Sequence, residues 1–138
     1  MKRLAGIICA LALAGCAGME PAASQPPSGW TGAWGASPTI PPAGGKSFEN
    51  QTVRQVIRLS TGGAAVRIRF TNEYSDKPLE IGAATIAMAG ADSKPNGEFR
   101  TLTFGAQPSV TIPAGAPLLS DPVTLDVKAL DSLSISIF

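Results

Sequence analysis

The alternation of apolar and polar residues in short segments constrains the fold of this chain more than any other feature. It is clearest in Ala65–Thr71, where three apolar side chains point one way and Arg67 and Arg69 point the other. A period of two residues is typical of half-buried β-strands. Further strands are expected at Val53–Ser60, Leu79–Ala89, Phe99–Phe104, Ser109–Ile112, Val123–Val127 and Ser132–Phe138.

Glycine and proline separate these segments. Gly62 and Gly63 predict a tight hairpin that pairs Val53–Ser60 with Ala65–Thr71, because glycine accepts a positive φ at little steric cost. Further connections are expected at the loop Ala91–Glu98 and the turn Pro113–Ala116.

One segment is ambiguous, because the alanine-rich run Leu79–Ala89 is also compatible with a helix. Pro78 precedes it and Gly82 interrupts it, so we predict a strand. Residues 30–138 are therefore expected to form one all-β domain, an antiparallel β-sandwich or jelly roll. No helical segment is present to cross over between parallel strands.

Composition excludes several kinds of chemistry. The chain of 138 residues has no histidine, which removes Ser-His catalysis and imidazole metal ligands from what it can do alone. The net charge is +1 with only 15% charged residues, so no nucleic-acid partner is expected. No residues have metal-ligand spacing, and no phosphate-binding loop opens a helix, so neither a metal nor a cofactor is expected.

The N-terminus is typical of an exported lipoprotein. Lys2 and Arg3 precede the apolar run Leu4–Ala14, which is shorter than the roughly 20 residues a membrane-spanning helix needs. Small residues before Cys16 resemble a bacterial lipobox, which predicts a signal peptide at 1–15 and lipidation of Cys16. The alternative is an ordinary secretory signal with a chance cysteine.

Residues 16–29 are small, polar and proline-rich, which predicts an extended tether between the lipid and the domain. Cys9 would leave with the signal peptide, so no disulfide is expected. Without Lys2 and Arg3, nine basic residues remain against ten acidic ones. The predicted location is the cell envelope, with the lipid on Cys16 in the membrane. Ala17 favours the outer membrane, because it replaces the aspartate associated with inner-membrane retention.

The segment Ser132–Phe138 is a predicted strand with a strongly apolar face. At the edge of a sheet it would be a template for pairing, and natural proteins guard such edges. We therefore expect either a neighbouring strand to cover it or the polypeptide to continue, and favour continuation.

Six segments in order resemble the N-terminal β-domain of bacterial secreted SGNH/GDSL-type hydrolases, and they cover the whole region after the tether. They are WTGAWGASP (30–38), NQTVRQVIRLSTGG (50–63), VRIRFTNEY (66–74), PLEIGAATIA (78–87), LTFGAQPSVTIPAGAPLLSDPV (102–123) and SLSISIF (132–138). The resemblance implies a β-sandwich that precedes a flavodoxin-like catalytic domain.

In that family a GDS serine, oxyanion donors and an Asp-x-x-His motif supply the chemistry, and all belong to the second domain. None can be assigned here. Asp131-Ser132-Leu133 only echoes the motif, because Leu130 replaces the glycine and no base is present to activate Ser132. The resemblance therefore implies the non-catalytic part of an ester hydrolase, inactive alone, with the catalytic domain of the same polypeptide as its partner.

Several residues are candidates for ligand or interdomain contact. Across the expected hairpin, Arg54, Arg58, Arg67 and Arg69 would form one basic patch, which is a solvated face, a docking surface or an anion site.

Trp30 and Trp34 are expected on one side of a strand, either packed in a core or domain interface or stacked on a sugar ring. Asn72, with Glu73 and Tyr74, follows a strand, where it either builds a turn or faces an active-site mouth.

Two further functions stay open. A glycan-binding envelope lipoprotein would use the tryptophans as a stacking platform, whereas a structural envelope lipoprotein would bind no small ligand.

Overall fold

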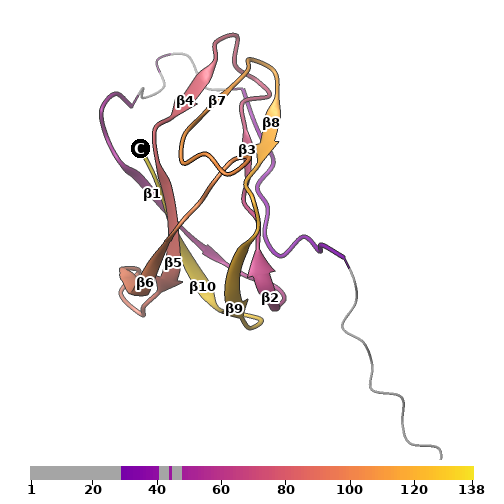
Figure 1. Cartoon of the computed structure of the whole chain (residues 1–138), viewed down its shortest axis with the longest axis vertical. Coiled ribbons are helices and arrows are strands. Elements are labelled where there is room, and N and C mark those ends of the chain that lie inside the picture. The colour runs from indigo at the N-terminus through magenta and orange to yellow at the C-terminus, as the bar shows by residue number, and fades with distance from the viewer. Residues whose placement is uncertain (1–28, 41–43, 45–47) are drawn as a thin grey trace, which may run out of the picture. The chain divides into compact units, whose positions relative to one another are not determined.

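The computed structural model describes residues 29–40, 44 and 48–138, and the compact unit within it is Thr31–Phe138 (Figure 1). The predicted signal peptide, Cys16 and the tether up to residue 28 lie outside the described residues. No helix in the described part of the chain is long and apolar enough to cross a membrane.

The described chain is built from strands that pair only in antiparallel fashion, which confirms the predicted all-β class and its sandwich-like character. The strands are β1 (Val53–Arg58), β2 (Gly63–Val66), β3 (Arg69–Thr71), β4 (Leu79–Ile81), β5 (Ala84–Ala89), β6 (Pro95–Thr101), β7 (Val110–Ile112), β8 (Pro117–Leu119), β9 (Val123–Val127) and β10 (Ser132–Ile137). The more specific jelly-roll topology stays a prediction.

The core is formed by a four-stranded sheet of order β1-β10-β5-β6, by three two-stranded ladders and by residues of connecting segments such as Leu102 and Phe104. The ladders are β2–β9, β3–β8 and β4–β7 (Figure 1). The inward side chains come from both groups, for example Ile86 and Leu133 from the sheet and Ile112 and Leu125 from the ladders. Burial of this apolar surface is the main contribution to stability in such a domain.

The predicted hairpin between Val53–Ser60 and Ala65–Thr71 is wrong. β1 pairs with β10 in the large sheet, whereas β2 pairs with β9 in a ladder of its own. Gly62 lies where the chain passes from one to the other, and a Cβ there would be only 2.5 Å from the carbonyl oxygen of Val127. The glycine is needed for close backbone approach, and neither Gly62 nor Gly63 has a positive φ.

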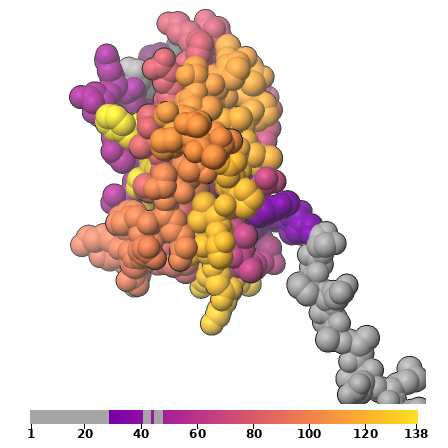
Figure 2. Space-filling model, viewed as in Figure 1, coloured from indigo at the N-terminus to yellow at the C-terminus, as the bar shows by residue number. Residues whose placement is uncertain are grey.

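Neighbouring strands cover Ser132–Phe138, which is one of the two alternatives expected for this segment. β10 lies between β1 and β5 and is hydrogen-bonded on both sides. In Figure 2 the yellow atoms at the end of the chain reach the surface between purple and rose segments. Phe138, directly after β10, is bound to the segment between β4 and β5. Its carbonyl oxygen accepts hydrogen bonds from the N–H groups of Gly82 and Ala83 at 2.8 and 3.2 Å.

The other expected strands are present with shifted limits. Leu79–Ala89 is strand rather than helix, but it breaks at Gly82 and Ala83 into β4 and β5. Across the break the alternation shifts by one residue: Ile81 is buried, and the next buried side chain is Ala84 rather than Ala83. Part of the predicted loop Ala91–Glu98 belongs to β6, and β6 ends at Thr101 rather than Phe104.

Candidate functional site

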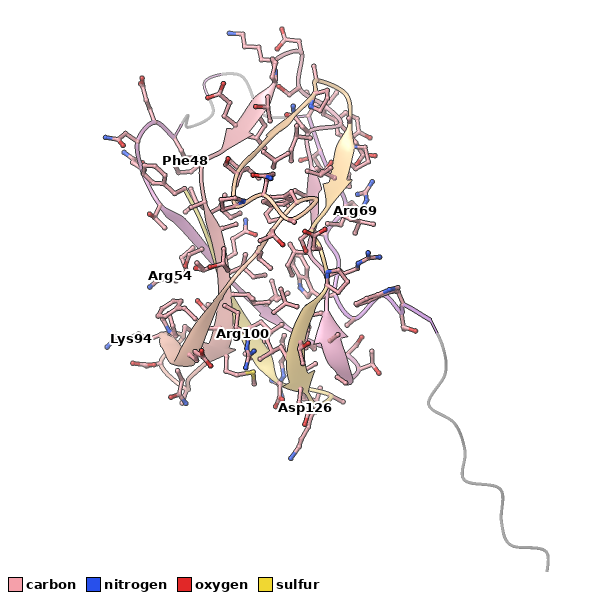
Figure 3. The ribbon with its side chains drawn as sticks, viewed as in Figure 1. Phe48, Arg54, Arg69, Lys94, Arg100 and Asp126 are labelled. Carbon is pink, nitrogen blue, oxygen red and sulfur yellow. The ribbon has the colours of Figure 1, made fainter. Side chains whose placement is uncertain are left out.

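The four candidate arginines do not form one patch. Arg54 and Arg58 belong to β1 in the four-stranded sheet, whereas Arg69 belongs to β3 in the ladder with β8, and Arg67 lies just before it. Figure 3 shows Arg54 and Arg69 on opposite sides of the ribbon. The prediction of a shared patch depended on the hairpin, so it is wrong for the same reason.

A polar cluster lies where β3 ends. Arg69 forms an ion pair with Glu73 at 3.0 Å, and the Thr71 hydroxyl donates to the other carboxylate oxygen at 2.6 Å. The hydrogen bonds from Thr71 and Arg69 hold the pKa of the Glu73 carboxyl below its ordinary value. Glu73 is therefore an ionised acceptor group at neutral pH.

Two shallow pockets flank this cluster. One, of about 160 Å³, is lined by Pro38 and Thr39 on one side and by residues 71–75 on the other. The second, of about 140 Å³, is lined by Arg69 and residues 117–119. Tyr74 borders the first pocket and is half exposed, so an aromatic ring and a carboxylate lie at one opening.

Asn72, a candidate contact residue, is directed into the domain. Its side-chain amide donates hydrogen bonds to the carbonyl oxygens of Lys77, Ile112 and Pro113 at 2.8, 3.2 and 3.0 Å. Its backbone N–H donates to Ala116 at 2.9 Å. The side chain is buried and ties the turn after β3 to the turn between β7 and β8, so these contacts fit its turn-building interpretation.

The carboxylate of Asp121 organises a loop near Arg67. Asp121 accepts hydrogen bonds from the Ala106 and Gly105 N–H groups at 2.7 and 3.1 Å and from the Thr103 hydroxyl at 2.7 Å. The bond from Ala106, then those from Thr103 and Gly105 and the charge of Arg67, lower the pKa of Asp121. This arrangement holds a loop in which Ala106 has a φ of 65°.

Neither tryptophan is a core residue, which rules out the core alternative that the sequence left open. Trp30 and Trp34 are 54% and 51% exposed, and residues 31–40 form no strand. Ala33 is the residue of this segment that packs on the core, and its carbonyl oxygen accepts the backbone N–H and the hydroxyl of Ser60 at 2.8 and 2.9 Å. The tryptophans remain accessible to a ligand or a neighbouring domain.

The residues that echo a GDSL motif are structural in this arrangement. Asp131 accepts a hydrogen bond from the Lys128 N–H at 2.8 Å and so caps the turn between β9 and β10. Ser132 begins β10 opposite Arg58. Among the described residues, no group of three or more aspartates, glutamates or cysteines could hold a metal ion.

Sequence reasoning identified Arg69 and noted Glu73 and Tyr74, but it did not predict the pockets. Their walls include Pro38 and Thr39, more than 30 residues away in sequence and without any periodic pattern. A search of protein-family models and a search of curated proteins each find no match to this chain.

Proposed function

We propose that this chain is the non-catalytic β-domain of an exported, lipid-anchored ester hydrolase of the SGNH/GDSL type. The observation that carries the proposal is the ordered set of six segments between Trp30 and Phe138 that resembles this family. An antiparallel all-β unit over the same residues supports it. In this proposal the domain supports a serine-esterase domain of the same polypeptide, and the lipid on Cys16 places both at the cell envelope.

Because the chain has no histidine, the proposal assigns ester hydrolysis to a second domain of the same polypeptide. Without an imidazole, the chain cannot form the Ser-His pair that activates a hydroxyl for acyl transfer. The isolated chain is therefore expected not to hydrolyse p-nitrophenyl acetate.

The experiment is activity-based labelling of the native polypeptide. Envelope proteins from the source cells are treated with a fluorophosphonate, which modifies activated serines, and captured with an antibody raised against residues 30–138. The proposal predicts a labelled polypeptide longer than this chain, with the label on a serine outside these 138 residues. A label on a serine within residues 30–138, or captured polypeptide without label, contradicts it.

A second candidate function is glycan binding, which the pocket beside Tyr74 favours. An aromatic ring next to an ionised carboxylate and an arginine can stack on a sugar ring and bond its hydroxyl groups. A glycan array probed with the purified chain tests it. Loss of signal with Tyr74→Ala locates binding at this pocket, and loss with Trp34→Ala locates it at the tryptophan. The matched control is Phe99→Ala, which removes another half-exposed aromatic ring. No glycan signal rejects this function.

A further inference from the structure

The two edges of the four-stranded sheet differ in how they are protected. β6 begins with Pro95, contains Gly97 at a φ of 97° and has a register shift against β5. Proline and bulges are the devices that natural edge strands use to prevent further pairing. β1 at the opposite edge is six residues long, has no proline and pairs with β10 without a register shift.

The direction in which each backbone N–H and C=O group of β1 points follows from the hydrogen bonds of Leu59, the residue after the strand. The N–H of Leu59 donates to Asp131 at 2.9 Å, and its carbonyl oxygen accepts from Leu130 at 2.8 Å, so both groups point toward the β10 side. Successive residues of a strand point these groups to opposite sides. The N–H and C=O groups of Arg54, Val56 and Arg58 therefore point away from β10, where the described residues offer them no backbone partner.

This edge already binds extended backbone at one point. The N–H of Ser60, which also points away from β10, donates to Ala33 at 2.8 Å. The segment that contains Ala33 then runs to Pro38 and Thr39, which lie beside residues 71–75 rather than along β1. In the described part of the chain, no other strand pairs with the edge from Arg58 back to Arg54.

The same three residues carry their side chains on one face. Val56 is 42% exposed between two exposed arginines, so an apolar position is flanked by positive charges two residues away on each side. The Nε of Arg54 donates to the Ser136 hydroxyl of β10 at 3.0 Å, so a carboxylate of an added strand would bind its two terminal guanidinium nitrogens. Figure 3 shows Arg54 projecting from this side of the ribbon.

We propose that the β1 edge binds an extended strand of a partner polypeptide that carries carboxylates two residues before and two residues after an apolar residue. Strand addition pairs the outward backbone groups of β1. The apolar residue then lies opposite Val56 and the carboxylates opposite Arg54 and Arg58, where arginine can bind them in bidentate fashion.

A second copy of this chain does not fit the same edge. Antiparallel pairing of two β1 strands about Val56 would set Arg54 of each copy opposite Arg58 of the other. Like charges directly opposite each other are destabilising. The arginines therefore select against self-association and in favour of an acidic strand.

The test uses the full chain and the peptide acetyl-Thr-Glu-Thr-Val-Thr-Glu-Thr-amide, followed by NMR and amide hydrogen exchange. In the protein alone, the amides of Gln55 and Ile57 should exchange slowly, and those of Arg54, Val56 and Arg58 quickly. The peptide should slow exchange at the second set only. Unchanged β1 amides at millimolar peptide overturn the proposal.

Matched peptides separate charge from backbone pairing. Replacing both glutamates with lysine should weaken binding at least about fivefold, which corresponds to two exposed ion pairs. Methylation of the peptide valine nitrogen removes one inter-strand donor and should weaken binding while leaving the charge unchanged. Equal binding of the glutamate and lysine peptides contradicts the acidic partner.

Matched variants complete the test. Arg54→Glu/Arg58→Glu should reverse the preference, so that the lysine peptide binds more tightly than the glutamate peptide. Lys94→Glu/Lys128→Glu changes the net charge equally at two turns and should leave the preference unchanged. Val56→Pro removes an outward donor but no bond to β10, and it should abolish binding of both peptides. A dimer that forms through β1, detected by sedimentation, assigns the edge to a second copy and overturns the proposal.

Discussion

Two serines that are buried to nearly the same extent differ in what their hydroxyl groups contact. The Ser120 hydroxyl accepts the Ile68 N–H at 3.0 Å and donates to the Asp121 carbonyl oxygen at 3.0 Å. Ser134, between Val56 and Ala87 in the sheet, has the one buried side-chain polar atom without a hydrogen-bond partner among the described residues. An unpaired buried hydroxyl costs free energy that a paired one does not.

The comparison of these serines is a direct test. Ser120→Ala should lower the free energy of unfolding by about 1–3 kcal/mol, because it leaves the Ile68 N–H unpaired. Ser134→Ala should leave it unchanged or raise it by up to about 1 kcal/mol, because only an unpaired group is lost. Urea unfolding followed by circular dichroism measures both. A Ser134→Ala loss as large as that of Ser120→Ala would show that the Ser134 hydroxyl is bonded in solution.

Asn72 is expected to be among the most sensitive polar positions. Asn72→Ala removes hydrogen bonds to three carbonyl groups and should lower the free energy of unfolding by about 2–4 kcal/mol. Asn96→Ala, at an exposed position of β6, is the control and should change it by less than about 0.5 kcal/mol. Equal effects in thermal unfolding would contradict the structural role of the Asn72 amide.

At the scale of elements, the connection after β1 depends on one of two adjacent glycines. A Cβ at Gly62 would lie 2.5 Å from the Val127 carbonyl oxygen and 3.0 Å from the Lys128 Cα, whereas at Gly63 it would meet only Ala65 at 3.7 Å. Gly62→Ala should therefore lower the free energy of unfolding by about 1–3 kcal/mol, and Gly63→Ala by much less. Denaturant titration of the pair checks this. The reverse order would support the tight hairpin instead.

The sequence predicted the positions of the strands better than the pairing between them. Alternation identifies which side chains point inward, as Phe70 and Leu125 illustrate, because it is a local property of the strand. Pairing is not local: β5 and β6 are the only consecutive strands that pair in the described chain. Burial in β10 also depends on neighbouring strands. The polarity of its serines suggests a solvated face, yet Ser134 and Ser136 are buried.

The contacts of the candidate site could be predicted only where the residues lie close together in the sequence. Arg69 and Glu73 lie four residues apart, and their contact follows from a strand that ends in a turn. The charge of Arg67 acts on Asp121 across two segments that the Ile68–Ser120 hydrogen bond joins, between positions 52 residues apart. No pattern within either segment predicts that contact.

At the scale of the whole molecule, acidic pH should destabilise the fold through particular carboxylates. Hydrogen bonds lower the folded-state pKa of Glu73, Asp92 and Asp121 below the ordinary values of 4.5, 3.8 and 3.8. A lowered folded-state pKa contributes stability that is complete above the unfolded-state value and is lost as pH falls through the folded-state value. The free energy of unfolding should therefore be flat near neutral pH and decline below about pH 4.5.

Substitution identifies the contributing group. Asp121→Asn should reduce the decline in unfolding free energy between pH 5 and pH 2, since its carboxylate no longer titrates. Asp126→Asn, on an exposed position of β9, is the matched control. Thermal unfolding across this range measures the slope, and an identical slope in both variants would contradict the role of Asp121.

The position of β10 has a consequence for how the protein is made. A ribosome delivers β1 and β5 long before Ser132–Ile137, yet β10 is the strand that joins them. Until Ser132–Ile137 emerges, β1 and β5 lack the strand that lies between them, and the core lacks the buried side chains of Leu133 and Ile135. The four-stranded sheet can therefore close only after Ser132–Ile137 has left the ribosome, whereas β5 and β6 can pair earlier.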